Sequence, residues 1–153
     1  MVLELKNLFM NEGGSLPLDT ELDFSAIGYH TGEPFGQPVT LKGGITNRVG
    51  IVRINAVAHY CFDAPCDRCG EPTEAERDCA IRHILVYEQN TDSDDFLLVP
   101  DMRLDLDDLV LSDVLLSLPA KHLCDEECRG VCPQCRKNRN TGECDCTDFD
   151  SDF

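Results

Sequence analysis

Cysteine is the residue type with the most specific chemical signal in this 153-residue chain, because eight of its ten cysteines fall into four close pairs. Two thiolates separated by two residues can turn toward one ion, and zinc takes four such ligands in a tetrahedron at about 2.3 Å. We therefore expect zinc, either one or two ions per chain, rather than a disulfide framework. The predicted ligands are, pair by pair, Cys66 with Cys69, Cys124 with Cys128, Cys132 with Cys135, and Cys144 with Cys146.

The spacing leaves two ways of grouping these pairs. In the favoured one, the third and fourth pairs form a compact site in the tail. The first pair then shares a second ion with the second pair, and this site closes a long loop of the chain. In the other, the second and third pairs hold one ion and the remaining cysteines are free. Structural zinc contributes on the order of 10–16 kcal/mol, so the choice matters for stability.

Two further cysteines, Cys61 and Cys79, lie within alternating apolar segments and are expected to be small core side chains. Enzymatic uses of the cysteines find little support. Residues 65–69, PCDRC, match the second half of a zinc deaminase signature, but no histidine is followed by glutamate two positions later, as the first half requires. No nucleophile–base set and no glycine-rich phosphate loop occur, so we predict that the chain is not an enzyme.

A basic stretch surrounds the third pair. Arg129, Arg136, Lys137 and Arg139 occur between Cys128 and Asn140 without any acid. They are candidate RNA contacts. The alternative is that they offset the net charge of about -2 on a zinc ion held by four thiolates.

The overall charge is the opposite of this local one. The formal net charge is -16, which repels nucleic acid and attracts basic proteins. We find no apolar run of about 18 residues, as a membrane span would need, and the first residues do not read as a secretory signal. These features predict a cytoplasmic protein with a cationic partner and no membrane association.

Three segments alternate with the period of two that a half-buried antiparallel strand requires. They are Val39–Asn47, Val49–Phe62 and Arg77–Glu88, with a tight connection at Asn47–Arg48 and the first cysteine pair in the turn between the last two. Weaker signals suggest a strand at Val2–Leu5 and a turn at Gly13–Gly14. The residues expected to face the core are Val39, Leu41, Ile45, Val52, Ile54, Ala56, Ala58, Tyr60, Phe62, Cys79, Ile81, Leu85 and Tyr87.

A helix is predicted over Leu104–Pro119, with aspartates at its positive end and proline at its close. Its apolar face would comprise Leu109, Val110, Val114, Leu115 and Leu118. Strands followed by a helix indicate an α+β fold: an antiparallel β-sheet, as a meander or an open barrel, with one main helix and a cysteine-rich C-terminal zinc knuckle region. We expect a sheet-plus-helix domain over residues 1–119 and a zinc-binding tail over 120–153, packed on it.

Together, the motifs CDRC, LDLDDLVLSDVLLSLP and LCDEECRGVCPQCRKNRNTGECDC resemble the YceD-type large ribosomal RNA subunit accumulation proteins, from about Leu41 onward. In that family glycine usually follows the knuckle, whereas Arg136 follows it here. The resemblance implies a non-enzymatic role in large ribosomal subunit biogenesis or ribosomal RNA accumulation. It also implies binding to a basic large-subunit ribosomal protein or a pre-ribosomal particle, with direct RNA contact left open.

A second function belongs to another class. The tail cysteines are similar, in reversed order, to the redox switch of a zinc-regulated chaperone. Oxidation would then expel zinc and form disulfides. Holdase activity after peroxide treatment separates this alternative from an assembly factor.

Overall fold

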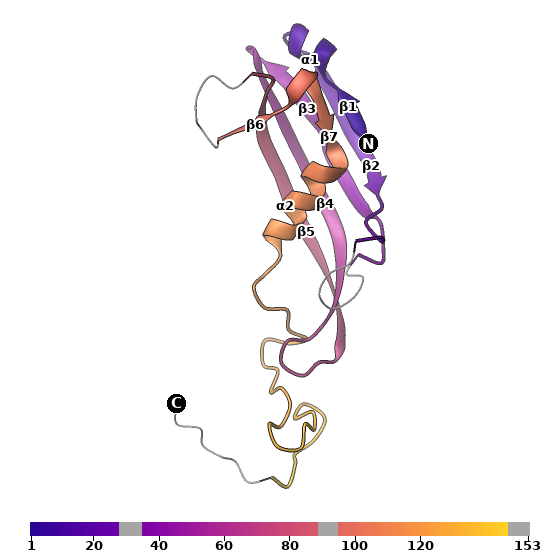
Figure 1. Ribbon diagram of the computed structural model, residues 1–153, viewed down its shortest axis with the longest axis vertical. Coiled ribbons are helices and arrows are strands. Elements are labelled where there is room, and N and C mark those ends of the chain that lie inside the picture. The colour runs from indigo at the N-terminus through magenta and orange to yellow at the C-terminus, as the bar shows by residue number, and fades with distance from the viewer. Residues whose placement is uncertain (28–34, 89–94, 147–153) are drawn as a thin grey trace.

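Two long strands, β4 (Ile51–Pro65) and β5 (Pro72–Val86), form the middle of the molecule in the computed structural model, which describes residues 1–27, 35–88 and 95–146. They pair antiparallel along their whole length (Figure 1). β3 (Val39–Arg48) pairs antiparallel with β4, and β2 (Ser15–Leu22) pairs antiparallel with β3. Three of these four consecutive strands, β3, β4 and β5, are the antiparallel strands that the alternation predicts, whereas β2 was not predicted.

The fifth strand of the sheet departs from that prediction. β6 (Phe96–Leu98) lies parallel to β5, with Phe96 opposite Ile84 and Leu98 opposite Val86. The expectation of an entirely antiparallel sheet is therefore wrong at this edge. The physical reason is the place where β6 begins: Phe96 lies opposite Ile84, two residues before the end of β5, so both strands run in the same direction.

The turn between β3 and β4 also differs from the predicted position. It lies at Val49–Gly50, not at Asn47–Arg48, and both turn residues have positive φ, 55° and 77°. Positive φ at both positions matches the right-handed twist of a two-residue hairpin. Asn47 instead belongs to β3, is 1% exposed, and donates from Nδ2 to the backbone oxygen of Leu8 at 2.9 Å.

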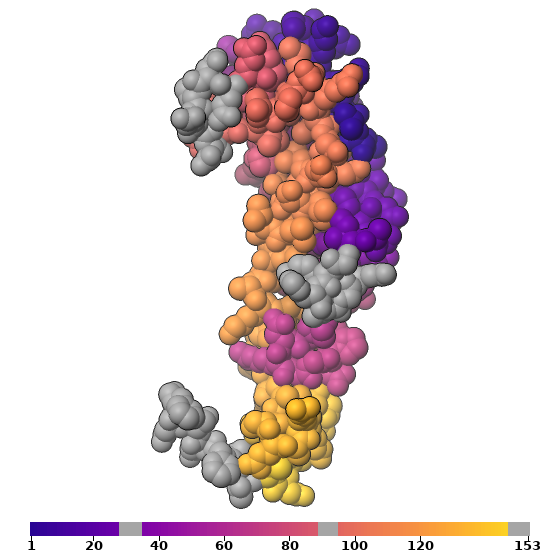
Figure 2. Space-filling model, in the orientation of Figure 1, coloured from indigo at the N-terminus to yellow at the C-terminus, as the bar shows by residue number. Residues whose placement is uncertain are grey.

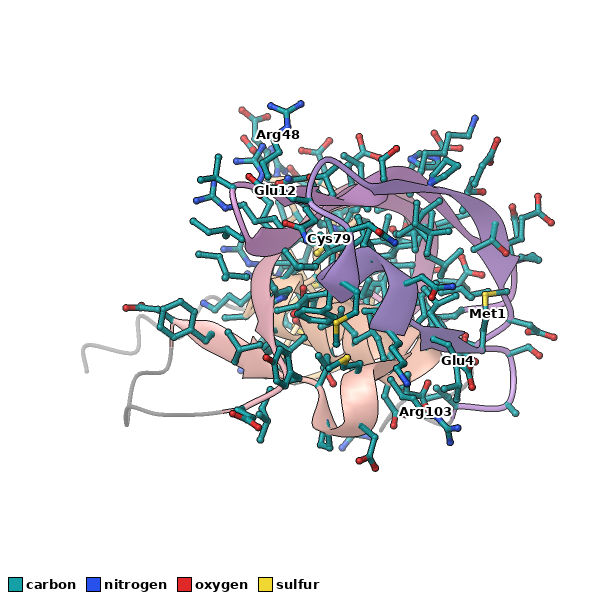
Figure 3. All side chains as sticks on the ribbon, turned by 90° about the horizontal axis from the view of Figure 1, so that it is seen from above. Met1, Glu4, Glu12, Arg48, Cys79 and Arg103 are labelled. Atoms are coloured by element: carbon teal, nitrogen blue, oxygen red, sulfur yellow. The ribbon has the colours of Figure 1, made fainter. Side chains whose placement is uncertain are left out.

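The core lies along the inner face of the curled sheet. The alternating residues of β3 and β4 that were expected to face inward are all buried, and so are Cys79, Ile81 and Leu85 of β5. Figure 3 looks along the long axis and shows Cys79 inside the curl, whereas Glu4 and Arg103 lie outside it. Tyr87 was expected to be a core residue, but it is 45% exposed and lies just after β5, where its ring meets Phe9 edge-on.

The sheet is covered by two segments, one at the start of the chain and one just before the main helix. β1 (Val2–Glu4) pairs antiparallel with β7 (Arg103–Asp105) in a short two-stranded ribbon. α1 (Lys6–Met10) and the 3₁₀ turn η1 (Pro100–Met102) lie beside this ribbon. The weak strand signal at Val2–Leu5 thus corresponds to β1, whose partner is far along the chain.

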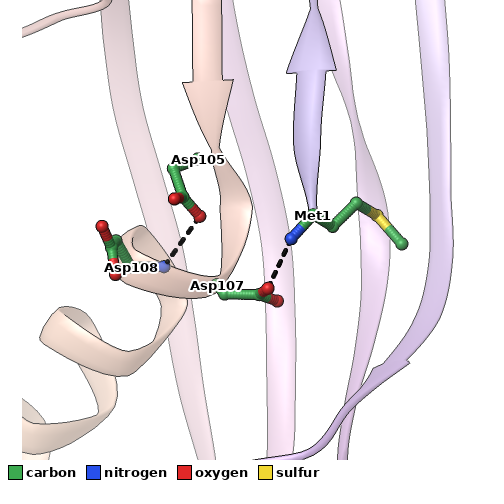
Figure 4. A network of polar contacts seen from close by, with 4 residues as sticks. All are labelled: Met1, Asp105, Asp107 and Asp108. Carbon is green, nitrogen blue, oxygen red and sulfur yellow. Dashed lines mark hydrogen bonds and ion pairs between the residues drawn. The ribbon is translucent and has the colours of Figure 1, made fainter.

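α2 (Leu106–Ser117) is the main helix, and it packs along the sheet (Figure 1). It begins two residues later than predicted, because Leu104 belongs to β7. Asp105 caps it by accepting a hydrogen bond from the backbone N–H of Asp108, and Asp107 accepts one from the amino group of Met1 (Figure 4). That bond to Asp107 raises the pKa of the amino group of Met1. The predicted apolar face is correct for Leu109, Val110 and Val114, whereas Leu115 is exposed.

The tail follows α2 and forms the narrow end of an elongated molecule (Figures 1 and 2). It lies against the tip of the β4–β5 hairpin, where the magenta and yellow surfaces meet in Figure 2. Whether residues 120–153 form a separate domain stays a prediction. No helix in the described part of the chain has the length and apolar character that crossing a membrane requires.

Candidate metal centre

The eight predicted ligands come together as two groups of four. The junction group, Cys66, Cys69, Cys124 and Cys128, joins the β4–β5 hairpin to the start of the tail. The tail group, Cys132, Cys135, Cys144 and Cys146, lies entirely within the tail. In each group all four sulfur atoms lie within 4.8 Å of one another. This is the grouping that the spacing favours, and the local grouping of the second and third pairs does not occur.

The sulfur positions fit a tetrahedral zinc ion. With zinc–sulfur bonds of about 2.3 Å, the edge of a tetrahedron is about 3.8 Å. In the junction group, Cys66 Sγ lies 3.7 Å from Cys128 Sγ, and Cys69 Sγ lies 3.6 Å from Cys124 Sγ. Both distances are far longer than the disulfide bond of about 2.05 Å, and all ten cysteines are free. Each group therefore offers a closed set of four thiolate ligands.

Each Cys-x-x-Cys pair is shaped by a tight turn with a left-handed residue after its second cysteine. In the junction group Gly70 has φ of 75°, and its N–H donates to the backbone oxygen of Cys66 at 2.9 Å. In the tail group Arg136 has φ of 58°, and its N–H donates to the backbone oxygen of Cys132 at 2.8 Å. The arginine at the family's glycine position thus keeps the turn, but in a conformation that disfavours side chains.

Backbone N–H groups prepare one thiolate in each group. Burial alone would raise the pKa of Cys66, but hydrogen bonds from the N–H groups of Cys69, Cys124 and Arg68 outweigh it and lower that pKa to about 6. In the tail group, the N–H groups of Cys135 and Gln134 lower the pKa of Cys132 to about 6. A thiolate must be formed before metal binds, so these donors favour the ligating state.

The raised pKa values of one other thiol in each group show what a bound cation would contribute. A hydrogen bond with Cys128 raises the pKa of Cys124 to about 12, and one with Cys135 raises that of Cys146 to about 12. Adjacent thiolates repel each other, so a protein without a cation would keep some of these sulfurs protonated. A zinc ion would remove that repulsion and make four thiolates around one ion favourable.

Polar contacts around the junction group attach the tail to the hairpin. Arg68 donates from Nη1 to the backbone oxygen of Cys128 at 3.0 Å. A Cβ on Gly130 would lie 3.2 Å from the backbone oxygen of Arg68, so the two segments approach closely there. Asn140 donates from Nδ2 to Cys128 Sγ at 3.2 Å, and this bond lowers the pKa of Cys128. The junction is therefore built from both cysteine groups' loops.

Sequence reasoning missed Asn140. Its Oδ1 also accepts from the N–H of Arg129 at 2.9 Å, so this one side chain connects the loop between the third and fourth pairs to the junction group. Asparagine and glycine in that loop signal turns in general, but spacing alone does not show that a turn residue will reach a sulfur of the other group.

The prediction for Cys61 is confirmed for burial but not for its place in the main core. Its side chain is 7% exposed, but it donates to Glu74 Oε1 at 2.8 Å and lies outside the main hydrophobic cluster that contains Cys79. Cys61, Asp63 and Glu74 form a third cluster of donor atoms. Burial of the thiol is the largest cause, and its hydrogen bond with Glu74 the second, of a pKa of Cys61 that is raised to about 12. The thiol therefore keeps its proton there.

The four basic residues between Cys128 and Asn140 are only partly brought together. Arg129 and Arg139 line one hollow of about 500 Å³, which Cys144 and Cys146 also border. Lys137 donates to the backbone oxygen of Glu143 at 3.3 Å, within the same loop. Contact of these residues with RNA stays a prediction.

Comparison with known proteins shows the family of the chain. The family model described as large ribosomal RNA subunit accumulation protein YceD matches residues 54–153. The chain belongs to the YceD family. The matched part contains β4 from Ile54 onward, all of β5 and α2, and every cysteine of the two groups.

Uncharacterized proteins of Mycobacterium bovis and Mycobacterium tuberculosis are also similar to this YceD-family chain. Each is 31% identical over 75 residues, which cover 46% of this chain and 36% of the relative. The match thus spans about a third of the length of these relatives. No solved structure matches the chain.

Proposed function

We propose that this chain is a non-catalytic, zinc-stabilised factor in the assembly of the large ribosomal subunit, and that it binds a basic large-subunit ribosomal protein or a pre-ribosomal particle. The observation that carries the proposal is the YceD family match, because it covers both cysteine groups and most of the hairpin that the junction group joins to the tail.

The closed geometry of the cysteine groups supports a structural use of the metal. A catalytic zinc ion keeps an open position for water or substrate. Four cysteines per ion fill the tetrahedron in each group. A zinc ion here would hold the hairpin and the tail in place, and it would supply no reactive water.

Charge supports a basic partner. The chain carries a net charge of -16, which favours encounter with a cationic protein and weakens encounter with bare RNA. The basic residues of the tail are the local exception, so RNA contact, if it occurs in the particle, belongs at the tail rather than at the sheet.

Co-sedimentation tests this function. Zinc-loaded protein should migrate with large-subunit precursor particles at about 50 mM salt and dissociate at about 200 mM, because the attraction is electrostatic. The matched control is small-subunit particles under the same conditions. Migration with neither particle, together with no binding to isolated basic large-subunit proteins, would contradict the proposal.

The exposure of the tail group favours a second candidate, the redox-sensitive chaperone-like protein. Cys135 is exposed and Cys144 and Cys146 are half-buried, so peroxide can reach them. Peroxide treatment should then release zinc and create holdase activity toward an unfolded client. Zinc release without holdase activity would leave the assembly factor as the better account.

A further inference from the structure

The outward side of the sheet is open to solvent, because both helices pack on its inner side. His83 Nε2 of β5 lies 2.6 Å from Asp113 Oδ2 of α2, and the inward-facing Asn47 of β3 donates to α1. The alternate positions of β3, β4 and β5 therefore point outward, and most of their side chains are exposed. We call these outward positions the outer face.

Charge is segregated along the outer face. The half near the turn between β3 and β4 carries three arginines and no acid: Arg48, Arg53 and Arg82. Figure 3 shows Arg48 pointing away from the curl. The half near the tip of the β4–β5 hairpin carries four acids and neither lysine nor arginine: Asp63, Glu74, Glu76 and Asp78. The two halves therefore present opposite charges on one continuous surface.

These charges are not compensated within the chain. No arginine of the outer face forms a salt bridge with a described residue, and no lysine or arginine of the described chain pairs with the four acids. Asp63 lies directly opposite Glu74, and like charges at such positions destabilise a sheet. Asp78 Oδ1 lies 2.6 Å from His59 Nδ1. A surface with the reverse order of charges would compensate both halves.

The order of charges is symmetric about one row of the sheet. Val57 of β4 and Ala80 of β5 lie opposite each other in this row, and Val57 is 47% exposed. Arg82 lies two positions after Ala80, and Asp78 lies two positions before it. The row thus separates the basic half from the acidic half.

A two-fold axis along this row makes the outer face complementary to itself. Such an axis reverses the strand direction and places each strand over the same strand of a second copy. Arg82 of one copy then faces Asp78 of the other. On β4, Arg53 faces the position of Cys61, which lies opposite Glu76 in the register. Each of these contacts occurs twice, because the two copies present the same surface.

We propose that the outer face is the contact surface of a two-fold dimer of this chain, with Val57 at its centre. A basic protein would meet the arginines and RNA would meet the acids, so neither fits both halves, whereas a second copy does. Lys42, in the central row, lies opposite Asp19 of β2, so that row adds no net charge. The inference goes beyond the proposed function and does not depend on it.

The size of the contact and the net charge set the strength of this dimer. Twisted sheets pack face to face with their strands about 30° apart, so contact is confined to the central rows. A contact smaller than about 1,200 Å² gives a weak dimer. The net charge of -16 repels two copies at long range. At about 0.15 M salt this repulsion is screened beyond about 8 Å, whereas the paired charges lie in contact.

Analytical ultracentrifugation of the zinc-loaded full chain is the first test. At about 0.15 M salt, we expect the weight-average mass to rise from monomer to dimer as the concentration increases from micromolar to millimolar. A monomer at every concentration would overturn the proposal. So would larger assemblies, because a self-complementary interface closes at two copies.

Charge reversal then places the interface on this face. Arg82→Glu and Asp78→Arg should each weaken the dimer at least tenfold, because each creates two like-charge contacts. An equal mixture of the two variants should dimerise again, since the mixed dimer has opposite charges at both contacts. Unchanged dimers of either variant, or a mixture that stays monomeric, would contradict this arrangement.

A second pair tests the same symmetry independently. Arg53→Glu should weaken the dimer, and the addition of Glu76→Arg to the same chain should restore it. Lys121→Glu is the matched control, because Lys121 is exposed and follows α2, away from the outer face. It should leave the dimer unchanged, and all variants should retain the zinc content of the wild type. Absence of rescue by Glu76→Arg would show that the two positions do not meet.

Co-sedimentation with large-subunit precursor particles separates the dimer from the proposed function. If the wild type is monomeric but Arg82→Glu and Asp78→Arg each abolish particle binding, the outer face serves the assembly partner and the dimer is wrong. If the wild type dimerises and the monomeric variants still bind the particles, the dimer stands as a property apart from assembly. If the wild type dimerises but migrates with neither ribosomal particle, the assembly role is wrong and the dimer stands.

Discussion

The junction group and the tail group have the same number of ligands, and each contains one Cys-x-x-Cys turn, but their surroundings differ. Three of the four cysteines in the junction group are buried, and its ligands come from two segments far apart in the chain. The tail group has one buried cysteine, and all its ligands lie within a short stretch. Equal ligand sets can therefore have unequal consequences for the fold.

This comparison shows which group holds the molecule together. The junction group crosses from the hairpin to the tail, over a sequence separation of 55 positions between Cys69 and Cys124. The tail group closes only its own loop, and Asn140 connects that loop to Cys128 by a side-chain bond to sulfur. Loss of metal should loosen the body–tail junction in the first case and only the tail in the second.

Replacement of one cysteine ligand in each group should have the largest effect on stability, and it tests directly whether the two groups are equivalent. Cys66→Ser should remove one zinc ion and lower the free energy of unfolding by about 4 kcal/mol or more, because loss of a structural metal is among the most destabilising changes. Cys144→Ser should also remove one ion but leave the main unfolding transition nearly unchanged. Native mass spectrometry and thermal unfolding measure both.

Cys61→Ser is the matched control for these variants, because a serine hydroxyl can still donate to Glu74 and neither group changes. It should keep two zinc ions. Equal destabilisation by Cys66→Ser and Cys144→Ser would show that the two groups hold the fold equally.

The rate of zinc release to a chelator should also distinguish the two groups. With excess chelator and a colorimetric zinc indicator, we expect two phases, and the fast phase should belong to the tail group because its cysteines are more exposed. Cys144→Ser should abolish the fast phase. A single phase, or loss of the slow phase in that variant, would mean that exposure does not set the order of release.

Substitution of the residue that follows each Cys-x-x-Cys turn should have a smaller effect on stability. It should destabilise the junction group and stabilise the tail group. Gly70→Ala forces a side chain into a left-handed conformation with no contact to relieve it, and should cost the junction group about 1 kcal/mol. Arg136→Gly should stabilise the tail group by about 1 kcal/mol. Competition with a zinc chelator of known affinity measures both. Stabilisation by Gly70→Ala would contradict this reading of the turns.

A substitution in the turn between β3 and β4 should have the smallest effect on stability, and it serves as a reference outside both cysteine groups. Val49→Asn replaces a β-branched residue at positive φ with one that tolerates it, and should stabilise the sheet by about 1 kcal/mol or less. Zinc release from both groups should not change. A change in either release rate would show that the sheet and the metal groups are more strongly coupled than their contacts suggest.

Much of the body could be predicted from sequence, because the period of two in β3, β4 and β5 reports burial directly. The alternation around Val52 and Ile54 identified the inner face, and the aspartates near Leu106 identified the start of α2 to within two residues. The direction of β6 could not be predicted, since three residues carry no periodicity and direction depends on the path of the connection.

Sequence by itself predicted eight cysteines as candidate ligands in pairs, because the spacing of a pair fixes how two neighbouring sulfurs can turn. Which pairs come together was decided by tertiary structure. The β4–β5 register puts Cys66 and Cys69 at the hairpin tip, and α2 with the linker returns Cys124 and Cys128 to that tip. Separation along a chain gives only the length of the connection, so the meeting of distant segments depends on the folded path.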